Sequence, residues 1–280
     1  RTRGGRVLTE RPIRVVPPPS KPGSVKVSAG PGKGLGENTA VEVILDASGS
    51  MLTRQGGQTR IGIAKETLVN LLGEAIPAGT PFALRVFGHK EADSCRTDLE
   101  IPLGPLDVVS ARQRVRAVQA MNRARTPIAT SLSKTRSDLE DATGDRIIIL
   151  LTDGEETCNG DPLQAIDSLM ASSDNLRVNI VGYAIDDKDL RETFRSWAAL
   201  GDGLYLTAPD AEELAAAMRQ VLEIPFEVRR DETTVVTGVT GDSEWVLPAG
   251  DYQLHYKLNG QLNSKPIRIT SERLTQISLP

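Results

Sequence analysis

Short apolar runs alternate with stretches of helical periodicity through the middle of the chain. The runs at 41–45, 82–87, 147–151, 178–183 and 204–206 have the length and composition of buried strands. Between them, apolar residues recur at intervals of three and four, as at Ile61, Ala64, Leu68 and Leu71, which is typical of a helix with one buried face. A further run at 99–103 predicts a short edge strand. Strands that alternate with helices predict a doubly wound, mostly parallel α/β sheet over residues 39–223.

Residues that favour helix starts support this assignment. Ser110 is expected to cap one helix, because a serine hydroxyl can accept a hydrogen bond from a free backbone N–H of the first turn. Asp161 followed by Pro162 is typical of a cap and the first helical position. The last helix of this region is expected over about 210–222.

The two ends of the chain have different patterns. Residues 1–38 are basic and rich in proline and glycine, which predicts an extended arm or a solvated linker. From residue 224 onward only strand-like runs occur, with turn sequences at 248–251 and 259–260, so residues 224–280 are expected to form a small, sandwich-like all-β domain. So few residues make a thin core. We therefore predict that the arm adds a strand to this domain, because both should emerge from the same face of the α/β unit.

Composition and charge narrow the classes of function. The chain has 280 residues, of which 39% are hydrophobic and 25% charged, as in ordinary globular proteins. Its net charge of −4 gives no indication of a nucleic-acid partner. No apolar run approaches the ~20 residues of a transmembrane helix. The sequence begins with Arg1, so a leader could have been removed, and its numbering says nothing about export.

The sequence offers little material for an enzyme. It contains no HExxH motif and no GxSxG motif that follows a strand. Its two histidines, His89 and His255, lie in different predicted domains, which leaves little basis for a Ser-His-Asp triad. We therefore expect no enzymatic activity.

Polar residues follow directly after two of the predicted strands. The first run ends in Asp46, and Ser48 and Ser50 follow at a spacing of two, so a tight turn can bring their three oxygens to one point. Oxygen-only sites with few carboxylates suit a hard divalent cation, although a polar turn with a helix cap is the alternative. Asp153 follows the run at 147–151. Because ligands bind beyond the carboxyl ends of parallel strands, both aspartates stand where a site is expected.

Together with Thr126-Pro127-Ile128 and Thr152-Asp153-Gly154, the segment Asp46-Ala47-Ser48-Gly49-Ser50 resembles the von Willebrand factor A domain and its metal-ion-dependent adhesion site. The resemblance implies that hydroxyls and carboxylates of five residues hold a cation: Asp46, Ser48, Ser50, Thr126 and Asp153. Mg²⁺ is the expected ion, with Mn²⁺ or Ca²⁺ as alternatives. It also implies that an acidic side chain of a protein partner completes the coordination.

Three further residues are tentative ligand-binding candidates. Arg125 stands where many relatives have glycine, and it either holds the loop by pairing with an acidic neighbour or reaches the second oxygen of the ligand carboxylate. Glu155 either tunes the site or is a solvated loop residue. His89 is either an extra ligand or a hydrogen-bonding group that fixes its loop.

The two cysteines, Cys95 and Cys158, are compatible with one disulfide or with two free thiols. The fold prediction places both in loops at the edge that carries the predicted metal site. The sequence also resembles exported bacterial members of the family around these cysteines, which implies a disulfide and therefore an oxidising, extracytoplasmic compartment. The expected function is a divalent-cation-dependent adhesion or protein-binding module. The alternative is an intracellular assembly subunit that acts with an ATPase.

Overall fold

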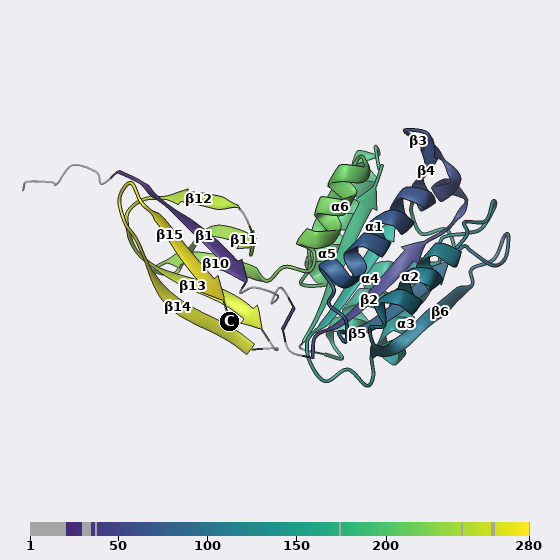
Figure 1. Ribbon diagram of the computed structural model, residues 1–280, viewed down its shortest axis with the longest axis horizontal. Helices are drawn as coiled ribbons and strands as arrows, with labels where there is room; N and C mark the ends of the chain where they lie inside the picture. The colour runs from purple at the N-terminus through teal and green to yellow at the C-terminus, as the bar shows by residue number, and fades with distance from the viewer. Residues whose placement is uncertain are drawn as a thin grey trace, which may run out of the picture.

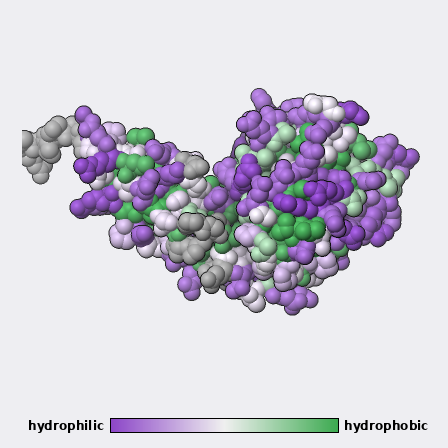
Figure 2. Space-filling view, viewed as in Figure 1, coloured by the Kyte–Doolittle hydropathy of each residue, from purple (hydrophilic) through white to green (hydrophobic). Residues whose placement is uncertain are grey.

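A computed structural model describes residues 21–29, 35–36, 38–173, 175–241, 243–258 and 261–279. These residues form two lobes, an α/β lobe and a β sandwich, joined through a narrow connection (Figure 1). Hydrophilic side chains cover much of the visible face of both lobes (Figure 2). The first twenty residues of the predicted arm lie outside the described ranges.

A six-stranded sheet forms the centre of the α/β lobe, with the strand order β6-β5-β2-β7-β8-β9. Five of its strands are parallel, and β6 pairs antiparallel with β5 at one edge. The strands are β2 (Ala40–Asp46), β5 (Pro81–Phe87), β6 (Thr97–Pro105), β7 (Arg146–Thr152), β8 (Leu176–Tyr183) and β9 (Tyr205–Ala208). The predicted mostly parallel sheet is confirmed.

Helices cover both faces of this sheet, so each strand is buried on two sides. One face packs against α1 (Arg60–Glu74), α2 (Val108–Ala117) and α6 (Ala211–Gln220), and the other against α3 (Ile128–Asp138), α4 (Pro162–Met170) and α5 (Lys188–Leu200). Each face of the sheet has its own hydrophobic core, and alternate residues of β2 pack into the two cores. Val43 and Leu45 pack into the core on the α1 side, and Ile44 packs into the core on the α3 side.

The caps of two helices test the expected helix starts. Asp161 accepts a hydrogen bond from the Gln164 N–H at 3.0 Å, as expected for the cap of α4. The expected cap at Ser110 is wrong. The Asp107 carboxylate caps α2 instead and accepts a bond from the Ser110 N–H at 2.8 Å, so this helix begins three residues earlier than expected.

The β sandwich consists of two sheets with one core between them. The larger has the order β11-β10-β13-β14 and the smaller β12-β1-β15. Their strands are β10 (Pro225–Arg230), β11 (Thr233–Val239), β13 (Gly250–Leu258), β14 (Gln261–Ile269), β12 (Glu244–Leu247), β1 (Gly23–Ala29) and β15 (Leu274–Leu279). β1 lies between β12 and β15, and buries Val25 and Val27 in this core. A strand near the start of the chain, β1, therefore completes a sheet whose other two strands come from the C-terminal part of the chain.

The sandwich meets the α/β lobe at the amino ends of the parallel strands. Arg177, at the start of β8, donates hydrogen bonds to the carbonyls of Glu223 at 2.8 Å and Leu222 at 3.3 Å, in the short link between α6 and β10. Lys257 of the sandwich lies 3.5 Å from Asp202 of the α/β lobe. A cavity of about 450 Å³ lies at this junction. The carboxyl ends of the strands therefore lie at the opposite edge, remote from the sandwich.

The helices of the described ranges lack the combination of length and hydrophobicity needed to cross a membrane.

Candidate metal centre

Asp46 is the last residue of β2, and both of its carboxylate oxygens are fixed. Oδ1 accepts a hydrogen bond from the Ser48 N–H at 2.7 Å. Oδ2 accepts one from the Thr152 hydroxyl at 2.6 Å, at the end of the neighbouring strand β7. The side chain is completely buried. Parallel pairing of β2 with β7 therefore places Asp46 beside the segment that carries Asp153.

The two serines extend this network toward Asp153. The Ser48 and Ser50 hydroxyl oxygens lie 3.1 Å apart, and the Ser50 hydroxyl donates to Asp153 Oδ1 at 2.6 Å. Ser50 lies in the short 3₁₀ helix η1 (Gly49–Leu52) and is exposed, whereas Ser48 and Asp153 are buried. Four of the five predicted metal ligands are thus connected by hydrogen bonds or by direct contact of their oxygens.

Gly88 allows the end of β5 to pass close to the loop that carries Ser48. Its φ of +75° lies in the left-handed region, and a Cβ at this position would stand 2.5 Å from the Ser48 backbone nitrogen. Only glycine avoids both the strained backbone and this overlap. The geometry of the Asp46–Ser50 segment therefore depends on the residue that directly follows the adjacent strand β5.

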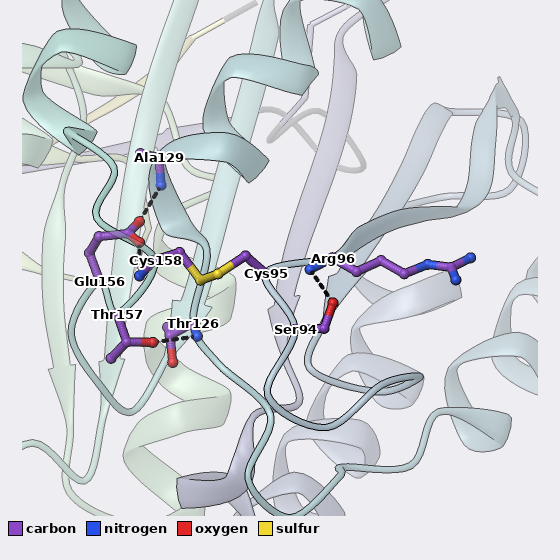
Figure 3. The surroundings of a disulfide bond; sticks show 8 residues. All are labelled: Ser94, Cys95, Arg96, Thr126, Ala129, Glu156, Thr157 and Cys158. Carbon is purple, nitrogen blue, oxygen red and sulfur yellow. Dashed lines mark hydrogen bonds between the residues drawn. A yellow bond between two sulfur atoms is a disulfide. The ribbon is translucent and has the colours of Figure 1, made fainter.

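Thr126, the fifth predicted ligand, is buried just before α3. Its N–H donates to the Thr157 hydroxyl at 2.7 Å (Figure 3). Its carbonyl accepts from the Thr157 N–H at 3.1 Å. The preceding loop is attached to the same edge, because the Met121 N–H contacts the carbonyls of Ala47 at 3.2 Å and Gly88 at 3.1 Å. Thr126 is therefore tied both to the Asp46 loop and to the segment that follows Asp153.

A cationic side chain that the sequence did not identify also reaches this site. Arg60, at the start of α1, places Nη1 2.8 Å from Asp153 Oδ2 and donates from Nη2 to the Ala184 carbonyl at 3.3 Å. A single arginine at a helix start is indistinguishable in sequence from a solvated one. Its role follows only from the position of α1 against the sheet.

The electrostatics of the site favour a further cation. Burial raises the pKa of Asp46 to about 6, and the negative charge of nearby Asp153 adds to this rise. Two buried carboxylates thus share a site in which only Asp153 pairs with a cationic side chain, Arg60, among the described residues. The remaining donors are neutral hydroxyls. This oxygen-only donor set fits a hard divalent cation such as Mg²⁺.

Two of the three tentative residues lie exposed close to the predicted ligands in sequence. Arg125 forms no hydrogen bond or ion pair within the described ranges, so the expectation that it holds its loop by pairing is not met. Arg123 does this instead, with its guanidinium 2.6 Å from Asp93. Glu155 is also exposed. Its neighbour Glu156 is half-buried and accepts two backbone hydrogen bonds.

His89 belongs to a separate charged cluster. Its Nε2 lies 2.9 Å from Glu100, and possible ligand atoms of His89, Asp98 and Glu100 lie within 4.8 Å of one another. Lys90 stands 2.5 Å from Glu100, and Arg96 stands 2.9 Å from Asp98. Because these side chains already balance the acidic charges, the geometry favours a hydrogen bond that fixes the loop over a metal-ligand role for His89.

The predicted disulfide is confirmed. Cys95 and Cys158 are bonded, with sulfurs 2.04 Å and Cα atoms 5.8 Å apart, and their sequence separation is 63. The bond joins the loop before β6 to the loop after β7 (Figure 3). It therefore lies at the same edge as the predicted metal ligands.

Comparisons with known proteins agree with this architecture. Residues 41–156 match the family model of the von Willebrand factor type A domain. The uncharacterised Bacillus subtilis protein YwmD is 38% identical over 190 residues, which cover 64% of this chain and 83% of YwmD. YwmC of the same organism is 31% identical over 187 residues, covering 60% and 76% of the two chains.

Two solved structures resemble the fold. A von Willebrand factor type A protein from Catenulispora acidiphila superimposes with a TM-score of 0.55 at 16% identity, covering 92% of this chain and 75% of that one. An aerotolerance-related membrane protein from Bacteroides fragilis gives a TM-score of 0.52 at 20% identity, covering 66% and 98%. At these identities, the likeness concerns the fold alone.

Proposed function

This chain belongs to the von Willebrand factor type A domain family, and we propose that it is a divalent-cation-dependent protein-binding module. The observation that carries this proposal is the contact network of Asp46, Ser48, Ser50 and Asp153 at the carboxyl edge of the sheet. In the proposal, these four residues and Thr126 hold the cation. The partner supplies an acidic side chain.

The charge balance of the site supports recognition of a carboxylate. Asp46 and Asp153 supply the negative charge that retains a divalent ion, while the serine and threonine hydroxyls add none. Arg60 compensates part of the Asp153 charge. A bound ion supplies an electrophilic position for an oxygen ligand. An incoming carboxylate therefore meets little net negative charge.

Arg125 is suited to a second contact with the partner. It directly precedes Thr126, is exposed, and has no ion-pair partner within the described part of the chain. A guanidinium can pair with a carboxylate through two parallel hydrogen bonds. In the proposal, Arg125 engages the second oxygen of the same carboxylate or an adjacent acidic residue.

The position of the sandwich supports a spacer role. It attaches at the amino ends of the strands, whereas the hairpin of β3 (Arg54–Gln55) and β4 (Gln58–Thr59), which follows the Asp46 loop, lies at the remote end of the α/β lobe (Figure 1). The proposed binding edge therefore points away from the sandwich. Recognition at this edge requires no chemical transformation, and we propose that the protein is not an enzyme.

The disulfide supports an extracytoplasmic location, because such bonds persist in oxidising compartments. It also weighs against the alternative of an intracellular assembly subunit that works with an ATPase. The proposed location is secreted, periplasmic or at the cell surface.

A peptide selection tests this function even though the partner is unidentified. A random peptide library is selected on the immobilised full chain in Mg²⁺, and in parallel in the presence of a chelator. The proposal predicts that peptides with acidic residues are enriched only in Mg²⁺, and that Asp46→Ala abolishes this enrichment. Asp141→Ala is the matched control, because it removes an exposed aspartate from the α3–β7 loop. Equal enrichment in chelator, or by the Asp46→Ala variant, would refute the proposal.

A further inference from the structure

The helix that follows Thr126 lacks a cap of its own. Pro127 occupies the cap position of α3 and makes no side-chain cap hydrogen bond. Glu156, from the loop after β7, takes this role: its Oε2 accepts the Ala129 N–H at 2.8 Å, and its Oε1 accepts the Cys158 N–H at 2.6 Å (Figure 3). One carboxylate thus fixes both the first turn of α3 and its own loop.

Consecutive residues of this loop hold the segment that begins at Thr126. Thr157 bonds Thr126 through both its side chain and its backbone, next to the contact that Glu156 makes with Ala129. The loop also packs tightly against α3, because a Cβ at Gly160 would stand 2.5 Å from the Ala129 Cβ. Movement of this loop would therefore move Thr126.

The disulfide anchors the same loop covalently. Cys158 directly follows Thr157 and is bonded to Cys95, in the loop before β6. Cys95 is exposed and Cys158 is half-buried, so a small reductant can reach the bond. Neither the two cysteines nor Thr157 is a predicted metal ligand, whereas Thr126, which this loop holds, is one.

We propose that Glu156, Thr157 and the Cys95–Cys158 disulfide form a clamp that positions the Thr126 hydroxyl for the cation, and that a dithiol weakens cation binding by opening it. A dithiol supplies two electrons, so the Cys95–Cys158 bond breaks and each cysteine takes up one proton. The dithiol itself becomes a disulfide. Glu156 and Thr157 are positioning residues, and this inference rests on the proposed cation-binding function.

Substitutions in the clamp distinguish the loss of hydrogen bonds that position Thr126 from the loss of a negative charge near the site. Glutamine at 156 has one oxygen and can accept one of the two N–H bonds, whereas valine at 157 removes the hydroxyl and keeps the shape. We expect Glu156→Gln and Thr157→Val to lower the Mn²⁺ affinity of the full oxidised chain roughly tenfold to a hundredfold, the range for groups that orient metal ligands. Thr157→Ser restores the hydroxyl and should bind like the unaltered chain. Glu155→Gln is the matched control, because it makes the same charge change at an exposed neighbour.

A second readout does not depend on metal. Amide hydrogen exchange in the metal-free protein should accelerate over residues 126–131 in Glu156→Gln and Thr157→Val, but not in Glu155→Gln or Thr157→Ser. Circular dichroism confirms that each variant is folded. Unchanged exchange in folded Glu156→Gln and Thr157→Val chains overturns the clamp.

The disulfide is tested by titrating Mn²⁺ into the Cys95→Ser, Cys158→Ser double variant and into the chain reduced with dithiothreitol and then desalted anaerobically. Both should bind Mn²⁺ more weakly than the oxidised chain, again roughly tenfold or more. If the oxidised chain binds Mn²⁺ and every clamp variant matches it, the clamp is overturned and the proposed function stands. If the oxidised chain binds no Mn²⁺, both are overturned.

Discussion

The fully buried carboxylate of Glu42 allows a direct test of how a buried charge affects the stability of this fold. Glu42 lies in β2 with no exposed surface, and neither of its carboxylate oxygens has a hydrogen-bond partner within the described residues. Arg85 stands 3.7 Å away but directs its hydrogen bonds, at 2.7 and 2.5 Å, to Asp138 at the end of α3. Burial raises the pKa of Glu42 well above its ordinary value of 4.5, and the negative charge of Asp138 adds to this.

The expected effect of Glu42→Leu follows from this arrangement. Leucine fills a similar volume and removes a buried carboxylate that has no hydrogen bond, and such a group costs about 1–3 kcal/mol. Arg85 keeps its pair with Asp138. We therefore expect Glu42→Leu to raise the free energy of unfolding at pH 7 by roughly 1–3 kcal/mol.

The pH dependence of this gain has a defined sign. Because the pKa of Glu42 is higher in the folded than in the unfolded chain, the folded chain binds more protons above pH 4.5. The Glu42 contribution is thus most favourable below pH 4.5 and is lost as the pH rises through the folded pKa. Glu42→Leu lacks this loss, so its advantage should grow with pH.

Urea unfolding at pH 5 and pH 8, followed by circular dichroism, measures both effects. Glu140→Leu, which replaces an exposed glutamate in the loop after α3, is the control and should change stability by less than ~0.5 kcal/mol. A loss of stability in Glu42→Leu that grows with pH would contradict this prediction, because it would mean that a charged Glu42 stabilises the fold through Arg85.

Three further perturbations have defined outcomes. The disulfide joins residues with a sequence separation of 63, so the chain-entropy model predicts that the Cys95→Ser, Cys158→Ser double variant loses ~4 kcal/mol of unfolding free energy. Urea unfolding measures this loss, and an unchanged midpoint would contradict it. Arg60→Gln should raise Mn²⁺ affinity about tenfold, because it removes a positive charge 2.8 Å from Asp153. Calorimetry measures this affinity, and weaker binding would mean that Arg60 positions Asp153 for the ion. Gly88→Ala should destabilise the chain by about 2 kcal/mol or more, since it combines a φ of +75° with a close backbone approach, and a change in melting temperature of less than ~2 °C would exclude that strain.

The pattern of apolar and polar residues was sufficient to predict which edge of the central sheet carries the candidate metal site. Buried parallel strands are nearly continuous apolar runs, and polar residues directly after two of them indicate carboxyl ends at one edge. Pairing of β2 with β7 in the structure brings Asp46 and Asp153 together for this reason. The disulfide was likewise predicted, through resemblance to exported relatives.

Residues whose roles depend on distant contacts could not be identified in this way. Arg60, Glu156 and Thr157 lie in sequence contexts typical of solvated positions, and only the packing of α1 and the fold of the loop after β7 give them partners. The start of α2 was misplaced because Asp107 and Ser110 are both good cap residues. The local sequence does not determine which of the two the tertiary structure uses.

In the proposed function, one divalent cation binds at a single site formed by Asp46, Ser48, Ser50, Thr126 and Asp153. The most direct measurement is an equilibrium Mn²⁺ titration of the metal-free full chain, read by electron paramagnetic resonance of free Mn²⁺, beside the Ser48→Ala variant. We expect the unaltered chain to bind one Mn²⁺ that Mg²⁺ displaces, and Ser48→Ala to bind Mn²⁺ at least roughly tenfold more weakly. Binding of equal affinity in both chains, or no binding to the unaltered chain, would contradict it.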